Sequence, residues 1–541
     1  MNKYLILILI LAALLRFTAL AVFPSGLNAD EAALGYNAYS LLLTGKDEHG
    51  HFMPVNLESF GDFKPALYAY LLVPLVKVLG LTEFVVRLPS ALFGVLCVFL
   101  IYVFVRQLMP NKSQAGSVSA LFLAISPWHL HFSRGAWEVN VATTLILLGL
   151  VFFLRWLKNP RLSYLVAVML SFSLSMYSYQ SARVIAPILG LGLAACYFGT
   201  FWKNLKQSFL SLFMLVLFLT PFLVSIISSD AASRIGGVGL TADIGPVNFV
   251  QELRVQHIGP SSLVGKLLHN RPVIYSLQFI KNYLTHFEGN FLFVNGDVIE
   301  RNRVPETGLL YFTDVILVAF GAAFLILNCS KYPKFRIVWL WLATAPIASA
   351  LTFQVPHALR AQNLVVPMIV LTSAGLIQII RVFTHPKIKF IVTLLLVVTY
   401  VWQFTRYLHQ YYVHYPKTYP SAWEYGFKEL VAYVAQNQSR YQKIIVTDKF
   451  DQPYSLFLFY LKYPPQQFQG NHKLTFRDKY NFSTVRDFDK YSFTNTSWDL
   501  VRDVHGSLII AAAQDIPTVG VNIVKTINFP NGQPGFKIIS N

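Results

Sequence analysis

Two adjacent carboxylates, Asp30 and Glu31, directly follow the first apolar segment of the chain, in the stretch PSGLNADE (24–31). General-base catalysis needs one carboxylate within hydrogen-bond reach of the nucleophile. We therefore expect Asp30 to accept the proton of an incoming hydroxyl, and Glu31 to orient the acceptor or the base. The alternative is a pair of solvated carboxylates in a loop.

Basic residues recur at the ends of later apolar segments, and we expect them to bind a phosphate: Lys64 in FKPAL, Arg134 in SRGAWEVN, Arg183 in YSYQSAR and Arg360 in PHALRAQN. An ammonium near the amino end of a helix at lipid-phosphate depth favours an anion, as do the backbone N–H groups there. Each residue taken alone has a plainer interpretation. Lys64 could extend towards lipid headgroups, Arg134 could pair with Glu138 one helical turn away, and the other arginines could be interfacial anchors.

Three further residues from the same segments, Glu138, Tyr179 and His357, are candidates for positioning the acceptor or the sugar, together with Glu31. A charged side chain at the edge of a membrane bundle is costly, and such residues usually face a cavity and carry function. These residues and the cations should therefore outline an anion-binding bowl beneath a carboxylate pair.

One base and several cations suit the transfer of a sugar from a lipid-linked phosphate. A phosphate with a second pKa of about 6 is already a good leaving group, so cations can stabilise it without a general acid. The acceptor hydroxyl is the weak partner and needs the base, and direct displacement would invert the anomeric carbon. The sequence has no nucleotide-binding signature, so we expect no cofactor; no metal ligands are assigned, and whether a divalent metal assists stays open.

The composition is that of a membrane protein. Of the 541 residues, 55% are hydrophobic and only 13% are charged, against roughly a quarter in soluble domains. Stretches of about 17 to 22 residues, long enough to cross the bilayer, predict an all-α bundle of about eleven transmembrane helices at 4–23, 88–106, 115–130, 139–155, 162–179, 184–201, 208–227, 309–328, 336–352, 362–380 and 388–405.

The charge distribution predicts the orientation. If the amino terminus is cytoplasmic, the short loops on that side and the terminus itself contain no Asp or Glu and the following basic residues: Lys3, Arg106, Lys112, Arg155, Lys158, Arg161, Lys203, Lys206, Lys331, Lys334, Arg336, Arg381, Lys387 and Lys389. By the positive-inside rule these loops face the cytoplasm. The active site and the carboxyl terminus should then lie outside the cytoplasmic membrane. The net charge of +18 thus reflects topology and does not indicate nucleic-acid binding.

Two outer regions, 24–87 and 228–308, are too long to be turns, and we expect interfacial helices at 65–80 and 262–286. Residues 1–409 would form the membrane domain and residues 410–541 a small extracytoplasmic α/β unit, called the C-terminal module below. Its predicted strands are KIIVTD (443–448) and SLIIAAA (507–513), with a helix at PYSLFLFYLKY, helical spacing at 421–437 and a terminal hairpin at Pro530-Asn531-Gly532. The three cysteines, Cys97, Cys196 and Cys329, are interpreted as small hydrophobic residues.

Several of these segments together resemble the GT-C superfamily, specifically the bacterial glycosyltransferases related to protein O-mannosyltransferases and to the lipid A aminoarabinose transferase. The resemblance covers about residues 1–405 and is carried by Arg16 to Glu31, Phe63-Lys64-Pro65, RLPSALFG (87–94), SRGAWE (133–138), Asn295-Gly296-Asp297 with GLLY (308–311), and HALR (357–360). It implies that Asp30 is the catalytic base, that Glu138 fills the second acidic position and that Lys64 holds the donor phosphate. Ala66 departs from the family pattern, which often has a second proline there.

The expected partners are a polyprenyl-phosphate sugar, membrane lipids and an acceptor. The sugar could be a hexose such as mannose or a pentose, and the acceptor could be a protein, a lipid or a glycan. The main alternative function is a transporter or flippase, which would place ionisable residues at the membrane midplane. A membrane-anchored binding protein is a third possibility, but it leaves Asp30, Lys64 and Glu138 unexplained.

Overall fold

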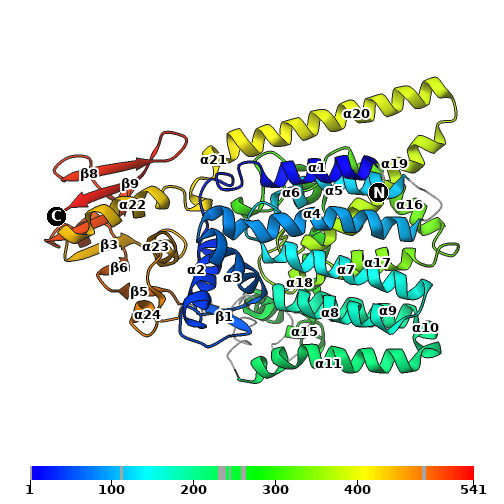
Figure 1. Ribbon diagram of the computed structural model, residues 1–541, viewed down its shortest axis with the longest axis horizontal. Helices are drawn as coiled ribbons and strands as arrows, with labels where there is room; N and C mark the ends of the chain where they lie inside the picture. The colour runs from blue at the N-terminus through cyan, green and yellow to red at the C-terminus, as the bar shows by residue number, and fades with distance from the viewer. Residues whose placement is uncertain (1–2, 110–113, 229–238, 243–244, 257–262, 478–482) are drawn as a thin grey trace.

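The computed structural model describes residues 3–109, 114–228, 239–242, 245–256, 263–477 and 483–541. A bundle of helices makes up most of the molecule, and a mixed sheet with its own helices stands at one end of the bundle (Figure 1). Of the predicted features, Lys112 and parts of the outer region 228–308 lie outside the described residues.

Within the described residues, a helix occupies each of the predicted apolar segments. These helices are α1 (Lys3–Phe17), α4 (Glu83–Leu108), α5 (Ala115–Ile125), α7 (Glu138–Lys158), α8 (Leu162–Ser178), α9 (Ala182–Cys196), α11 (Leu205–Ser228), α16 (Asp314–Leu327), α17 (Phe335–Thr344), α19 (Val365–Val382) and α20 (Pro386–His409). Short helices extend some of them: α6 (Pro127–His131), α10 (Phe198–Lys203) and α18 (Ile347–Ala350).

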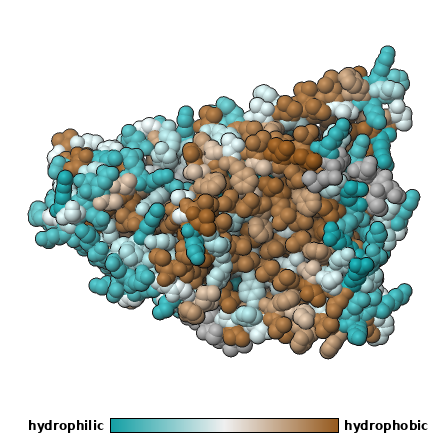
Figure 2. All heavy atoms as spheres, in the orientation of Figure 1, coloured by the Kyte–Doolittle hydropathy of each residue, from teal (hydrophilic) through white to brown (hydrophobic). Residues whose placement is uncertain are grey.

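The bundle has the apolar surface of a membrane protein. Five helices of the described chain are long and apolar enough to cross a bilayer: Glu83–Leu108, Glu138–Lys158, Leu205–Ser225, Gln362–Val382 and Pro386–Thr418. Figure 2 shows a broad hydrophobic area over the bundle, with hydrophilic residues towards both ends of the molecule. The helical membrane fold is confirmed, whereas the count of eleven crossings stays a prediction.

The basic loops and the sheet lie at opposite ends of the bundle. Helix α1 begins at the end where α4 and α7 finish and where α20 starts, and the C-terminal sheet stands at the other end (Figure 1). The predicted charge asymmetry therefore corresponds to two physical ends of the molecule.

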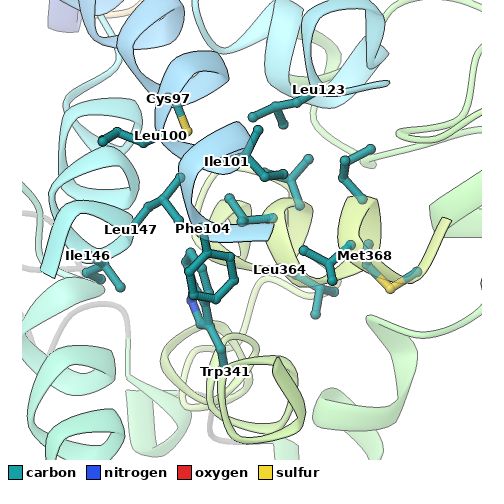
Figure 3. Close-up of a cluster of buried hydrophobic side chains, with 14 of the residues drawn as sticks. Cys97, Leu100, Ile101, Phe104, Leu123, Ile146, Leu147, Trp341, Leu364 and Met368 are labelled. Carbon is teal, nitrogen blue, oxygen red and sulfur yellow. The ribbon is translucent and has the colours of Figure 1, made fainter. Parts of the chain in front are cut away.

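Large apolar side chains from several helices fill the interior of the bundle. Cys97, Ile101 and Phe104 of α4 pack with residues of α5, α7, α17 and α19, among them Trp341, which is fully buried (Figure 3). Helices α16 and α19 approach most closely at two glycines: a Cβ on Gly321 would lie 1.9 Å from the carbonyl oxygen of Leu371. Any side chain there would separate the two helices.

The first outer region contains α2 (Ala29–Thr44), an antiparallel hairpin of β1 (Asn56–Ser59) and β2 (Asp62–Pro65), and α3 (Leu67–Leu79). Helix α3 coincides with the predicted interfacial segment. The hairpin was not predicted, and it changes the setting of Lys64. This lysine lies in β2, two residues before Ala66, the N-cap of α3, so the hairpin fixes its backbone.

The second outer region holds η2 (Leu240–Ala242), α13 (Gly245–Gln256), α14 (Leu263–Leu268), α15 (Arg271–Thr285), η3 (Asn290–Val294) and η4 (Glu300–Asn302). The predicted helix at 262–286 is broken into α14 and α15 at Asn270, whose side chain accepts a hydrogen bond from the Val273 N–H and so begins a new helix. Helix η5 (Gln362–Leu364) leads into α19.

The C-terminal module is built on a seven-stranded mixed sheet with strand order β4-β5-β6-β3-β7-β9-β8. Its strands are β3 (Lys443–Thr447), β4 (His472–Leu474), β5 (Val485–Phe488), β6 (Tyr491–Thr494), β7 (Ser507–Ala512), β8 (Ile523–Asn528) and β9 (Pro534–Ser540). Among the described strands, the parallel pairs are β3 with β6 and β3 with β7. The predicted strands at β3 and β7 and the terminal hairpin are confirmed.

Helices and turns of the module are η6 (Gln410–His414), α21 (Tyr415–Thr418), η7 (Ser421–Trp423), α22 (Phe427–Asn437), η8 (Gln438–Arg440), α23 (Pro453–Leu461), α24 (Pro465–Phe468), α25 (Trp498–Val501) and η9 (Ala513–Asp515). The predicted helix at PYSLFLFYLKY is confirmed as α23. It packs on α2, where a Cβ on Gly35 would lie only 2.7 Å from the Phe459 ring.

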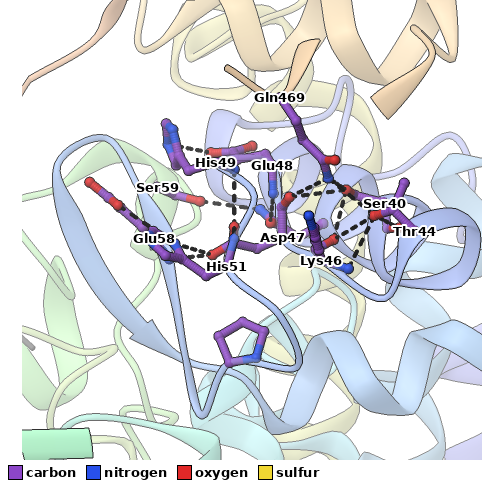
Figure 4. A network of polar contacts seen from close by, with 12 residues as sticks. Ser40, Thr44, Lys46, Asp47, Glu48, His49, His51, Glu58, Ser59 and Gln469 are labelled. Carbon is purple, nitrogen blue, oxygen red and sulfur yellow. Dashed lines mark hydrogen bonds and ion pairs between the residues drawn. The ribbon is translucent and has the colours of Figure 1, made fainter. Parts of the chain in front are cut away.

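A polar network fastens the module to the first outer region (Figure 4). The Gln469 amide donates to Ser40 Oγ at 3.0 Å and to the Asp47 carbonyl at 2.8 Å, and His49 Nδ1 lies 3.0 Å from His472 Nε2. Apolar packing and directional contacts therefore hold the module in a defined place against the bundle.

Candidate active site

The amino end of α2 positions the carboxylate pair. Asn28 caps the helix: its side chain accepts from the Glu31 N–H at 3.1 Å, while Glu31 Oε2 accepts from the Asn28 N–H at 3.3 Å. This reciprocal capping box fixes where the helix begins. Adjacent helical residues point about 100° apart, so Asp30 and Glu31 face different surroundings.

Glu31 is buried among protein groups and does not line the cavity described below. It is 1% exposed and pairs with the fully buried Arg87 through contacts of 2.9 and 3.0 Å, while its Oε1 accepts from the Ala136 N–H at 2.8 Å. The structure therefore does not place Glu31 in the cavity lining, and its role in orienting the acceptor or the base stays a prediction. Both oxygens of its carboxylate are occupied by the helix cap, the ion pair with Arg87 and the Ala136 N–H.

Asp30 faces cations instead. Its Oδ1 accepts from Lys64 Nζ, and its Oδ2 lies 3.6 Å from Arg301 Nη2. The Asp30 side chain is 32% exposed and that of Lys64 is 11% exposed, and Lys64 also lies over the Phe60 ring. The β1–β2 hairpin thus brings Lys64 to the start of α2.

These residues line a cavity of about 710 Å³ between the bundle and the C-terminal module. Six predicted site residues belong to its lining: Asp30, Lys64, Glu138, Tyr179, His357 and Arg360. Glu138 is the first residue of α7, Tyr179 follows α8 and Arg360 donates to Thr352 Oγ1 at 2.8 Å. The structure therefore brings together residues that are more than 300 positions apart in the sequence.

Two predicted phosphate ligands, Arg134 and Arg183, are not part of this lining. Arg134 is 1% exposed and donates to backbone carbonyls at the end of α1 and to the Tyr411 hydroxyl. Arg183 donates to Gln180 Oε1 at 2.8 Å and to Asn56. Both guanidinium groups hold loops in place, so the predicted set of phosphate ligands has to be revised.

Asp297 organises the far side of the cavity from a buried position. Its carboxylate accepts from the Ala358 N–H at 2.6 Å, the Ile299 N–H at 2.9 Å and Asn302 Nδ2 at 3.1 Å. Burial raises the pKa of Asp297 and these hydrogen bonds oppose the rise, leaving the pKa above its ordinary value. One carboxyl thereby joins the loop at 298–302 to the loop that carries His357 and Arg360.

Four charged residues of the lining were not predicted: Glu300, Arg301, Glu424 and Asp451. Arg301 Nη1 lies 3.3 Å from Asp451 Oδ2, so this guanidinium joins Asp30 on the bundle to Asp451 on the module. Burial acts to lower the pKa of Arg301, but the charges of Asp30 and Asp451 outweigh it and the pKa is raised. The only sequence signal was the charged run ERNR (300–303) in the second outer region.

The arrangement supplies a partly exposed carboxylate, Asp30, in contact with Lys64 and Arg301, in a cavity whose lining also includes Arg360. Such a site can hold an anionic group and activate a hydroxyl next to it, because preorganised charges act strongly where water is excluded. Among the described residues, no group of three His, Cys, Asp or Glu side chains is arranged as metal ligands.

Comparisons with known proteins show what the chain resembles in sequence and in fold. A family model described as dolichyl-phosphate-mannose-protein mannosyltransferase matches residues 63–227, which is less than half of the chain. The crystal structure of ArnT from Cupriavidus metallidurans bound to undecaprenyl phosphate is similar with a TM-score of 0.55 at 13% identity, over 98% of this chain and 97% of that one. No curated protein matches the chain.

Two further structures are more distant. The apo state of the same ArnT has a TM-score of 0.47 at 13% identity, covering 99% of this chain and 97% of that one. The Archaeoglobus fulgidus oligosaccharyltransferase in complex with Zn and sulfate has 0.49 at 14% identity, covering 85% and 61%. The family model and the first ArnT structure confirm the resemblance seen in the sequence, and the two weaker likenesses add nothing to it.

Proposed function

We propose, from its GT-C fold and the charges of its cavity, that the chain is an inverting glycosyltransferase that uses a polyprenyl-phosphate sugar. The observation that carries the proposal is the contact between Asp30 and Lys64 at the lining of the 710 Å³ cavity. It sets a proton acceptor beside a phosphate-binding cation, which are the two groups that this reaction needs.

In the proposed reaction, Lys64 and Arg360 bind the donor phosphate, and Arg301 adds positive charge beside Asp30. The acceptor oxygen attacks the anomeric carbon while the bond from that carbon to the phosphate oxygen breaks, and the bonding electrons leave with the phosphate. Asp30 takes the proton of the acceptor hydroxyl. Attack opposite to the leaving group inverts the anomeric carbon.

In the structure both Asp30 oxygens face cations, and a carboxylate held in this way is a poor acceptor for an incoming hydroxyl. A donor phosphate would compete with Asp30 for Lys64. We therefore infer that donor binding frees Asp30 Oδ1 for the acceptor, so that the base becomes available only when the leaving group is in place.

Glu138, Tyr179 and His357 are proposed to position the sugar or the acceptor, because they share the lining with Asp30. The sugar is proposed to be a hexose such as mannose, or a pentose, and the acceptor a protein, lipid or glycan hydroxyl. The cavity is lined by residues of the bundle and of the C-terminal module, and the module stands at the end of the bundle opposite the basic loops (Figure 1), which supports a site at the outer face of the cytoplasmic membrane.

The transporter alternative requires ionisable groups midway along the spanning helices. Asp30 and Glu138 instead stand at the first turns of α2 and α7, next to the C-terminal module. This placement favours chemistry at a membrane surface over passage through the bundle.

The test uses purified full-length protein in detergent or vesicles with radiolabelled polyprenyl-phosphate mannose, glucose and arabinose. Wild type should release label from at least one lipid, and Asp30→Asn should abolish release with the melting temperature little changed, because Asp30 is partly exposed. Asp499→Asn is the matched control, since this side chain is 86% exposed on the module. Near-normal turnover by Asp30→Asn would refute the assigned base.

A further inference from the structure

The C-terminal module supplies part of the cavity lining, and one of its residues stands out. Glu424, which follows η7, is 5% exposed, and its Oε1 accepts from the Asp451 N–H at 3.3 Å. Its second oxygen, Oε2, has no hydrogen-bond partner among the residues that the structure describes. An oxygen of this kind, on a residue that lines the cavity, is available to a ligand.

Two neighbouring lining residues have the same property within the described chain. Asn302 is 1% exposed with an unpartnered Oδ1, and Trp137 is 2% exposed with an unpartnered Nε1. Buried polar atoms are almost always hydrogen-bonded, and an orphan needs an explanation. Three such atoms around one cavity, from the bundle, an outer loop and the module, fit a ligand that carries several hydroxyl groups.

The surroundings of Glu424 favour a hydroxyl over a cation as its partner. Burial, reinforced by the nearby Asp451 charge, raises the pKa of Glu424 well above its ordinary value, which favours the protonated carboxyl. A neutral carboxyl both donates and accepts a hydrogen bond. A sugar hydroxyl also does both, so the two groups complement each other.

Glu424 is also held at a fixed place relative to Asp30. A Cβ on Gly26 would lie 2.0 Å from the carbonyl oxygen of Trp423, so the Asp30 loop and the residue before Glu424 are in close backbone contact. Arg301 joins Asp30 to Asp451, whose N–H binds Glu424. A sugar whose phosphate is bound by Lys64 would therefore lie between the proposed base and Glu424.

We propose that Glu424 is a specificity-determining residue that hydrogen-bonds a hydroxyl of the donor sugar. The module then takes part in reading the sugar and does more than cover the cavity. The inference rests on the proposed function and deepens it, because it assigns the sugar-recognition side of the same site to residues 421–451.

The experiment compares Glu424→Ala and Glu424→Gln with wild type, using polyprenyl-phosphate mannose and glucose and their singly deoxygenated analogues as donors. Sugar-free polyprenyl phosphate is the binding probe. Glu429→Ala is the matched control on the same module, since Glu429 is 57% exposed. Melting temperatures establish that each variant is folded.

For the natural sugar, Glu424→Ala should lower kcat/KM about 10- to 100-fold, the effect of losing one buried hydrogen bond to substrate. The Gln variant should recover most of this loss, because an amide also donates and accepts. One deoxy donor should already be poor with wild type and lose little more with Glu424→Ala, since both changes remove the same interaction. Affinity for sugar-free polyprenyl phosphate should not change.

Three results would overturn the assignment: an equal loss for every deoxy donor, a change confined to the KM of the acceptor, or weaker binding of sugar-free polyprenyl phosphate. A wild-type pattern in Glu424→Ala would overturn it as well. If wild type itself transfers none of the labelled sugars, the proposed function fails and this inference fails with it. If wild type is active and Glu424→Ala behaves identically, only the inference fails.

Discussion

Replacing Glu31 by alanine should destabilise the protein without removing the reacting groups. Arg87 and Glu31 are 0% and 1% exposed and meet through two contacts of 2.9 and 3.0 Å. Breaking a buried pair by deleting one partner costs about 3–5 kcal/mol, because the other charge is left uncompensated. Loss of the capping interaction adds about 1 kcal/mol, so we expect a loss of about 4–6 kcal/mol.

Thermal unfolding in detergent measures this loss. With an unfolding entropy of about 2.1 cal/mol/K per residue over 541 residues, the melting temperature should fall by about 3.5–5 °C. The double variant Glu31→Leu with Arg87→Met should lose less than the sum of the two single variants, because no buried charge remains. It should not recover fully, since Arg87 also donates to the carbonyl oxygens of Leu20, Pro24 and Gly26.

Sugar transfer, assayed at a temperature where each variant is folded, separates this structural role from a catalytic one. Folded Glu31→Ala should keep activity within a few-fold of wild type, whereas Asp30→Asn should have none. A Glu31→Ala protein with the wild-type melting temperature but no transfer would refute the reasoning and return Glu31 to the reacting site.

Two further predictions concern how the module is attached. Gly26→Ala should lower the melting temperature by the equivalent of about 1–3 kcal/mol, because φ of Gly26 is 124° and the added Cβ would overlap a backbone carbonyl of the module. The control is Gly50→Ala, which carries only the backbone strain, since φ of Gly50 is 99° and the space around it is open. Equal effects of the two substitutions would contradict the close contact between Gly26 and the module. Burial and the neighbouring His49 lower the pKa of His472, so its contribution to stability is present above pH 6.5 and is lost as the pH falls. For His49, burial is outweighed by the hydrogen bond and charge of Glu48, so its pKa is raised and its contribution is present below pH 6.5 and is lost as the pH rises through the folded value. Melting curves from pH 5 to 8 should therefore show His49→Gln losing stability on acidification relative to wild type and His472→Gln gaining it, and parallel curves for the two variants would contradict these assignments.

The sequence predicted the helical segments and the strands of the module well, because apolar length and alternation are local signals. It also indicated six of the cavity residues, since a charged side chain at the edge of an apolar segment needs a reason to be there. It could not show which of Asp30 and Glu31 is buried. Both follow the same cap residue, and only the three-dimensional position of Arg87, 56 residues further on, determines which carboxylate is buried.

The same limit explains the arginines. Arg134 donates to several backbone carbonyls at the end of α1, whereas Arg360 lines the cavity. In the sequence the two arginines cannot be told apart, because each follows an apolar segment. A guanidinium has five donors and serves equally well as a clamp on loops or as an anion ligand. Which role an arginine takes depends on which helix ends and loops lie near it in space, and a local sequence pattern does not predict this.

The residues that sequence reasoning missed share one physical cause: they acquire a role only when the module docks. Asp451 belongs to the module, and its carboxylate contacts Arg301, which also faces Asp30 on the bundle. One guanidinium between two carboxylates makes the charge around the proposed base depend on the position of the module. Docking of the module and the readiness of Asp30 are therefore coupled, and a change that shifts the module should alter proton transfer even when every residue of the bundle is intact.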